Sequence, residues 1–102
     1  MDAPFHAVAD PTRRAILERL RTAGPLSLSE IASDLPMTRQ AVTKHLDLLA
    51  DSGLVRVYRS GRERMHRLEA DPLKVVHEWL APYAAEWDQR LDRLRQHLEE
   101  NP

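Results

Sequence analysis

The sequence predicts a mainly α (α+β) fold in which several helices and one short β-hairpin form a single domain. Apolar residues recur at helical spacing over most of the chain, one stretch alternates apolar and polar residues as strands do, and proline and glycine separate these stretches. The 102 residues suffice for one hydrophobic core, yet the domain is small enough to gain stability from a partner subunit. We therefore expect residues 1–102 to form one domain.

The composition excludes several classes of protein. With 42% hydrophobic and 30% charged residues, the chain contains no uninterrupted apolar run of the kind that spans a membrane. Its first ten residues lack the basic start and apolar centre of a secretory signal, so we expect a cytoplasmic protein with no membrane partner. The absence of cysteine excludes disulfides, thiolate metal sites and a cysteine nucleophile.

The net charge of −1 conceals an uneven distribution along the chain. Residues 39–68 carry seven Arg or Lys against three Asp or Glu, a net charge of +4. Residues 69–102 carry four against eight, a net charge of −4, and residues 1–38 carry −1. The basic segment can face a polyanion, which would repel the acidic last third.

Two helices are predicted in the first third of the chain. The first spans residues 10–23, where Asp10 is suited to cap the N-terminus. The second spans residues 28–35, because Ser27 and Glu30 have the spacing of a capping box.

A third helix, predicted over residues 38–52, has two unlike faces. Its buried face is predicted to consist of Ala41, Val42, Leu46 and Leu49. Its opposite face carries hydrogen-bonding groups on Gln40, Thr43, Lys44 and Asp47. The short connection from the preceding helix and this polar outer face match the helix-turn-helix pattern.

A β-hairpin is predicted over residues 54–69, with its turn near Gly61. Arg59, Arg62 and Arg64 lie close to that turn. Such arginines can serve only to keep an exposed strand edge soluble. Directly after a helix-turn-helix, they favour a basic wing that contacts DNA.

Residues 72–99 are predicted to be helical, with a kink or a break at Pro82. One side of this region carries a coiled-coil-like apolar stripe: Leu80, Tyr83, Trp87, Leu91, Leu94 and Leu98. The domain's own core could cover that stripe, but a second subunit explains it more economically.

Three segments resemble the ArsR family of bacterial winged-helix repressors. These are "DPTRRAIL", "AVTKHLDLLADSGLV" and "SGRERMHRL", within a similarity that runs from about residue 5 to 98. The likeness is greatest to members that lack the metal site. It implies a winged helix-turn-helix with a two-stranded wing and terminal dimerisation helices. It also implies a homodimer that represses transcription from a palindromic operator, often that of its own operon, with Phe5 and Val8 joining the dimer interface.

The expected partner is double-stranded DNA. The candidate contacts of the recognition helix are Thr38, Arg39, Gln40, Thr43, Lys44 and His45, and those of the wing are Arg59, Arg62 and Arg64. Gln40 and Thr43 can hydrogen-bond base edges, and Lys44 can reach a guanine edge or a phosphate. The wing would follow the flanking backbone or the minor groove. Two alternatives stay open for His45, a half-buried ring beside the core or a phosphate contact.

A metal-responsive sensor with a non-cysteine site is one alternative function. Metal-sensing members of the family use cysteines near the recognition helix, or Asp and His ligands on the last helix. Here the last helix offers only His77 with Glu78, or His97 with Asp92 or Glu100, and no "DxH" pair. Because a metal site needs three or four convergent ligands, we expect no metal and no cofactor.

The other alternative is a winged-helix module that docks onto another protein. The polar recognition face and the arginine-rich hairpin favour DNA over that function. Catalysis is not expected, because the chain has no glycine-rich phosphate loop and no recognisable grouping of nucleophile, base and acid. No residue pattern selects an effector.

Overall fold

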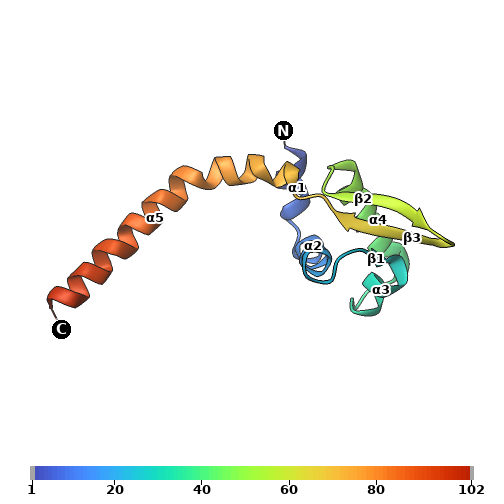
Figure 1. Cartoon of the computed structure of the whole chain (residues 1–102), viewed down its shortest axis with the longest axis horizontal. Coiled ribbons are helices and arrows are strands. Elements are labelled where there is room, and N and C mark those ends of the chain that lie inside the picture. Colours follow the sequence, from blue (N-terminus) through green and yellow to red (C-terminus); the bar gives the residue numbers. More distant parts are fainter. Residues whose placement is uncertain (1, 102) are drawn as a thin grey trace.

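The computed structural model describes residues 2–101 and confirms the mainly α (α+β) prediction. Along the chain lie α1 (Ala3–Val8), α2 (Pro11–Ala23), β1 (Leu26–Ser27), α3 (Leu28–Ser33), α4 (Arg39–Asp51), β2 (Val55–Ser60), β3 (Glu63–Leu68), the 3-10 helix η1 (Asp71–Leu73) and α5 (Lys74–Glu100). Figure 1 shows that all elements before α5 gather at one end, whereas α5 projects away from them. The arrangement is that of a winged helix-turn-helix with a long terminal helix.

The helix starts follow local hydrogen bonding. Ser27 and Glu30 form a reciprocal capping box at the start of α3, with N···O distances of 3.0 and 3.2 Å. Thr38 caps α4, because its hydroxyl accepts from the backbone N–H of Ala41 at 3.1 Å. Asp10 does the same for the first turn of α2. Each side chain satisfies a backbone donor that has no partner within its helix.

Helix α3 is shorter than the predicted 28–35, since it ends at Ser33. Arg19 of α2 donates to the carbonyl of Glu30 at 2.7 Å and forms an ion pair with Asp34 at 3.0 Å. The guanidinium thus binds a carbonyl of the last turn of α3. The hydrophobic pattern could not show this contact, because it comes from another helix.

The sheet has three antiparallel strands in the order β1-β3-β2. The hairpin pairs Val55 with Leu68, and its turn has Gly61 at a φ of 62°. The sequence did not predict β1, in which Leu26 pairs with His66. Two residues are too few to produce an alternating pattern.

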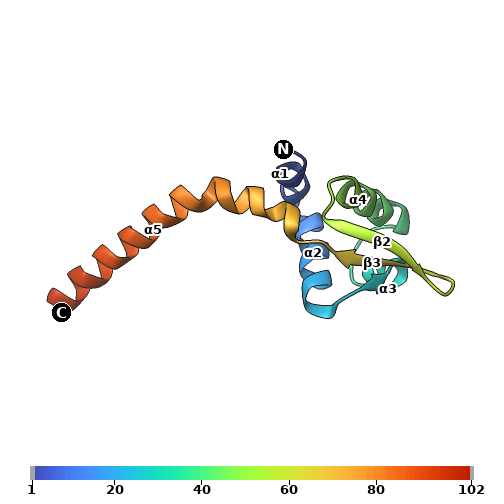
Figure 2. The ribbon, with the colours of Figure 1, turned by 45° about the horizontal axis from the view of Figure 1, so that its top comes forward.

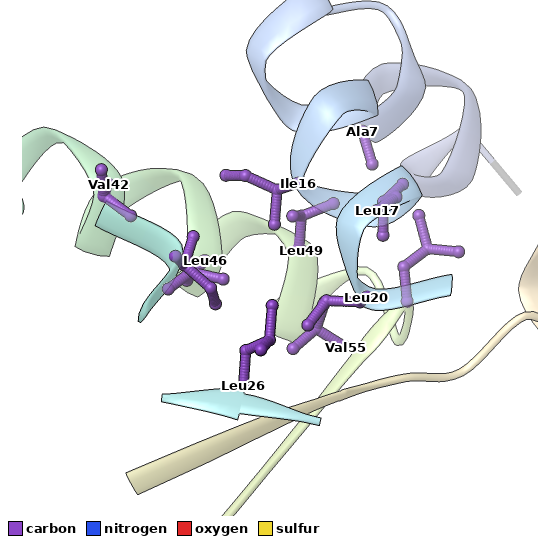
Figure 3. Close-up of a cluster of buried hydrophobic side chains, with 11 residues drawn as sticks. Ala7, Ile16, Leu17, Leu20, Leu26, Val42, Leu46, Leu49 and Val55 are labelled. Atoms are coloured by element: carbon purple, nitrogen blue, oxygen red, sulfur yellow. The ribbon is translucent and has the colours of Figure 1, made fainter. Parts of the chain in front are cut away.

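The core lies between α2, α4 and the sheet. Figure 3 shows its side chains pointing toward one another, with Ile16, Leu17 and Leu20 from α2 and Val42, Leu46 and Leu49 from α4. Ala7, Leu26, Ile31, Leu54 and Val55 complete the buried cluster. Burying one such large side chain contributes about 1.5–3 kcal/mol, so this cluster fixes the position of α4 in the domain.

Helix α5 runs through Pro82 without a break. The proline has no N–H for the carbonyl four residues earlier, which favours the curvature of α5 visible in Figures 1 and 2. The helix also begins two residues later than the predicted 72–99, because Asp71–Leu73 form η1, and it ends one residue later. No helix within residues 2–101 has both the length and the apolar character to cross a membrane.

Candidate nucleic-acid interface

The outer face of α4 is open to solvent and polar. Arg39, Gln40 and Lys44 are exposed and Thr43 is half-buried, whereas Val42 is fully buried on the inner side. The apolar side of α4 therefore packs into the core, and the polar side chains on its outer face remain free to bind a partner.

Two of these side chains, those of Arg39 and Thr43, form hydrogen bonds within the protein. The guanidinium of Arg39 donates to the hydroxyl of Ser29, which links the start of α4 to α3. The hydroxyl of Thr43 donates to the carbonyl of Arg39 at 2.9 Å. With its proton used in this way, the Thr43 oxygen offers its lone pairs outward as an acceptor. Ser29 was not among the predicted site residues.

The wing brings its arginines close together. Arg59 and Arg64 are directly opposite each other on β2 and β3, and Arg62 lies in the turn that joins these strands. All three are exposed, and within the described part of the chain none has a carboxylate within 4 Å. Like charges opposite each other destabilise a hairpin, so this arrangement suits an anionic partner.

The wing and α3 share a shallow groove. It is lined by Ser27, Leu28 and Ser29 at the start of α3 and by Arg62, Glu63, Arg64 and His66 of the wing. In Figure 2 the hairpin extends past α3. The helix-turn-helix and the wing therefore form adjoining parts of one surface.

Two arginines of the basic segment lie on the other face of the sheet. Arg56 pairs with Arg67 in register, next to the pair Val57 and His66. His66 is buried toward the core, and successive residues of a strand point to opposite faces. Arg56 and Arg67 thus point away from the groove, and Arg67 binds Glu69 at 2.9 Å. The +4 charge of residues 39–68 is therefore divided between two faces.

His66 has a structural role next to the groove. Its ring is buried, and Nδ1 lies 3.2 Å from the carbonyl oxygen of Leu26. Burial lowers the pKa of His66 more than that contact raises it, because desolvation disfavours the charged ring. A neutral ring that donates from Nδ1 fastens β1 to β3.

His45 lies against the start of α2. Its Nδ1 is 3.5 Å from Nη1 of Arg13 and 4.0 Å from Oδ2 of Asp10, and its side chain is 23% exposed. The hydrogen bond from the backbone N–H of Arg13 holds the pKa of Asp10 below its usual range. This placement is half-buried and is compatible with a phosphate contact as well. It leaves one ring nitrogen without a protein partner in the described chain.

The predicted dimer residues divide into two groups. All six members of the α5 stripe are exposed, from Leu80 at 36% to Leu98 at 60%. Phe5 contacts α5 through an edge-on ring contact with Trp79, with centroids 5.9 Å apart. Val8 is half-buried and packs against the core of its own domain.

Trp79 is an exposed aromatic residue that the predicted stripe left out. It is 58% exposed, and its ring is 5.2 Å from that of Tyr83, which is 6.5 Å from that of Trp87. The predicted stripe began one residue later, at Leu80, and so did not include Trp79.

Among residues 2–101 no three His, Asp or Glu side chains converge as metal ligands would.

The chain is similar to known transcriptional regulators. A family model described as a helix-turn-helix domain matches residues 8–58. The HTH-type transcriptional regulator YuzN of Bacillus subtilis is 43% identical over 79 residues, which cover 72% of this chain and 86% of that protein. The regulator Rv2034 of Mycobacterium tuberculosis is 46% identical over 75 residues, covering 74% and 69%. The crystal structure of the ArsR family transcriptional regulator RHA00566 matches with a TM-score of 0.73 and 40% identity, over 85% of this chain and 89% of that one. The chain belongs to the ArsR family.

Membership in this family gives the chain its general role. This ArsR-family protein is a DNA-binding transcriptional regulator that binds double-stranded DNA, and it is not an enzyme. The polar face of α4 and the wing are the surfaces on this regulator that suit a duplex.

Proposed function

We propose that this ArsR-family regulator is a homodimeric repressor that binds a palindromic operator through α4 and the wing. The observation that carries the proposal is the outer face of α4, which is exposed and rich in hydrogen-bonding groups but takes no part in the core. An α-helix fits the major groove of B-DNA, where such groups meet the base edges.

Sequence recognition would come from the middle of this face. Gln40 can bind adenine through two hydrogen bonds, and Lys44 can donate to guanine O6 or N7, or to a phosphate. Thr43 already donates its proton to Arg39, so it would act as an acceptor for the amino group of cytosine or adenine. These residues would select the base pairs of each half-site.

Position on the duplex would come from the start of α4. Thr38 and Arg39 lie where the backbone N–H groups and the helix dipole favour a phosphate. The hydrogen bond to Ser29 holds the Arg39 guanidinium beside α3 and so places it before DNA arrives. His45 would add a phosphate contact through Nε2, because Nδ1 faces Arg13.

The wing would supply affinity that depends on salt. Arg59, Arg62 and Arg64 are exposed cations at the tip of the hairpin, suited to the flanking backbone or the minor groove. Each phosphate that they neutralise releases a counterion, so affinity would fall steeply as salt rises.

Dimerisation would follow from the uncovered stripe of α5. Trp87 is 51% exposed and Leu91 59% exposed, as part of a stripe too large and regular for an isolated surface. A symmetric pair covers such a stripe with itself and presents two recognition helices to a palindrome. The protein named transcriptional repressor SdpR of Bacillus subtilis, 26% identical over 91 residues, supports repression as the outcome.

The test is fluorescence anisotropy on the DNA just upstream of the coding region, compared with a scrambled duplex at near-physiological salt. We expect tight binding to the first duplex only, with two subunits per site by analytical ultracentrifugation. Equal weak binding to both duplexes would contradict an operator at that position. No binding to any duplex, with no retention on heparin, would favour the protein-docking alternative.

A further inference from the structure

We propose that Arg13 is a positioning residue for DNA recognition, which ties α4 to α1 through His45. The orientation of the recognition helix then depends on how α1 is seated. This inference rests on the proposed role of α4 in DNA binding. It assigns to the "DPTRR" segment a part in recognition, although the segment lies outside the DNA-facing surface.

On the α1 side, the contacts of Arg13 are short. Its side chain is buried, with the residue 9% exposed. Nε donates to the carbonyl of Ala7 at 2.8 Å and Nη2 to that of His6 at 2.8 Å. Carbonyls in the last turn of a helix have no partner within it and favour a cation. One guanidinium thus closes the C-terminal end of α1.

On the α4 side, the third nitrogen of Arg13 meets the recognition helix. Nη1 lies 3.5 Å from Nδ1 of His45, whereas Oδ2 of Asp10, which would favour a proton on Nδ1, lies farther away at 4.0 Å. A guanidinium can only donate, so this contact is favourable only when Nδ1 carries the lone pair. Arg13 therefore selects the tautomer of His45 that is protonated on Nε2. That tautomer makes Nε2 a donor beside Lys44, as a phosphate contact requires.

The same chain of contacts continues toward α5. Phe5 of α1 meets Trp79 of α5 edge-on, with ring centroids 5.9 Å apart. Trp79 in turn contacts Tyr83, the second residue of the exposed stripe. A displacement of α5 would move α1, and with it the two carbonyls that hold Arg13. In this way one buried guanidinium connects the proposed dimer surface to the proposed DNA surface by direct contacts.

The decisive variant is Arg13→Lys, with Arg14→Lys as the matched control. Lysine keeps the charge, but a single ammonium cannot reach all three acceptors at the positions where arginine meets them. Arg14 binds the same end of α1, through the carbonyl of Val8 at 2.8 Å, from an exposed position. We expect Arg13→Lys to weaken operator binding about tenfold and Arg14→Lys no more than about twofold. Affinities are compared with every variant shown to be folded and dimeric.

The tautomer of His45 provides a second measurement, which would not change if Arg13 served only to stabilise the fold. In the free protein, ¹⁵N chemical shifts of the ring should show Nδ1 unprotonated in the wild type and in Arg14→Lys, and a mixture of tautomers in Arg13→Lys. A wild-type ring protonated on Nδ1, or operator binding unchanged in Arg13→Lys, would overturn the proposal.

A second variant covers the case in which Arg13→Lys does not fold. His45→Phe removes the same contact from the α4 side and leaves the buried cation in place. We expect it to lose about tenfold in operator affinity, and we expect faster hydrogen exchange in α4 of the free protein. Unchanged exchange in α4 would overturn the coupling. A wild-type protein that binds no DNA would defeat the proposed function alone, because the tautomer and the exchange are measured without DNA.

Discussion

The domain formed by residues 2–73 and the helix α5 carry similar amphipathic patterns but satisfy them differently. Every buried hydrophobic residue of the described chain lies between Ala7 and Val55, and α5 has none. In Figure 2 the outer part of α5 extends away from every other element. A hydrophobic stripe shows that a helix must be covered, but it does not show whether the cover comes from the same chain or from another molecule.

The largest effect is expected from leucine substitutions that compare the two regions directly. Leu49→Ala should lower the free energy of unfolding by about 2–5 kcal/mol, because Leu49 is 0% exposed. Leu91→Ala, the same change at a residue 59% exposed, should cost far less under conditions in which the protein is monomeric. Urea denaturation measures both values. Equal losses would show that α5 folds back onto its own domain.

The next effect concerns a second subunit. Trp87→Glu places a charge in the exposed stripe and should weaken dimerisation by about 2 kcal/mol or more, roughly thirtyfold or more in the dissociation constant. Gln89→Glu adds the same charge on the opposite side of α5 and should leave the dimer intact. Sedimentation velocity over a dilution series separates the two outcomes. A Trp87→Glu dimer as tight as the wild type would show that the interface lies elsewhere.

The polar face of α4 is also exposed, but substitutions on it should change only the affinity for DNA. Lys44→Ala should weaken operator binding by about 1–3 kcal/mol and leave folding and dimerisation unchanged. Lys74→Ala removes an equally exposed lysine at the start of α5 and should have little effect. Fluorescence anisotropy at constant salt compares them. If Lys44→Ala binds like the wild type, the recognition face of α4 is wrongly assigned.

A smaller effect is expected at a helix start within the domain. Ser27→Ala removes the cap of α3 and should lower stability by about 1 kcal/mol, since the N–H of Glu30 loses its acceptor. Ser33→Ala, at the other end of the same helix, should cost less, because the Glu30 carbonyl to which its hydroxyl donates also accepts from Arg19. Thermal denaturation of both variants tests whether the capping box stabilises the domain.

The smallest effect is a pH dependence of stability. The folded protein holds the pKa of His66 below its ordinary value of about 6.5, so the unfolded chain binds the proton more readily. His66 therefore favours folding fully above about pH 6.5, and that contribution is lost as the pH falls toward its lower folded-state pKa. Urea midpoints at pH 7.5 and 5.5 should differ less in His66→Asn than in His97→Asn, the control on exposed α5. Equal differences would exclude His66 as the cause.

The sequence predicted the elements whose signals are local. Caps such as Ser27 with Glu30 and the alternation of β2 and β3 depend on neighbouring residues, so one segment is enough to recognise them. The fold class followed from these signals, whereas the family followed from the resemblance of longer segments such as "DPTRRAIL".

What the sequence could not predict depends on contacts between distant segments. Arg19 binds a carbonyl in the last turn of α3, the pairing of β1 with β3 joins Leu26 to His66, and His45 lies against Arg13, 32 residues earlier. In the same way, the charge of residues 39–68 did not show that Arg56 faces away from the wing groove, because strand register decides it.

The proposed pairing of α5 would also make the protein sensitive to its own abundance. In the proposed dimer, the apolar stripe of α5 is covered by association, so the stability of the helix would follow mass action. The apparent melting temperature should therefore rise with protein concentration. In a cell that makes few copies, the monomer with a frayed α5 would dominate until synthesis raises the concentration. Operator occupancy would then increase more steeply than in proportion to the amount of protein.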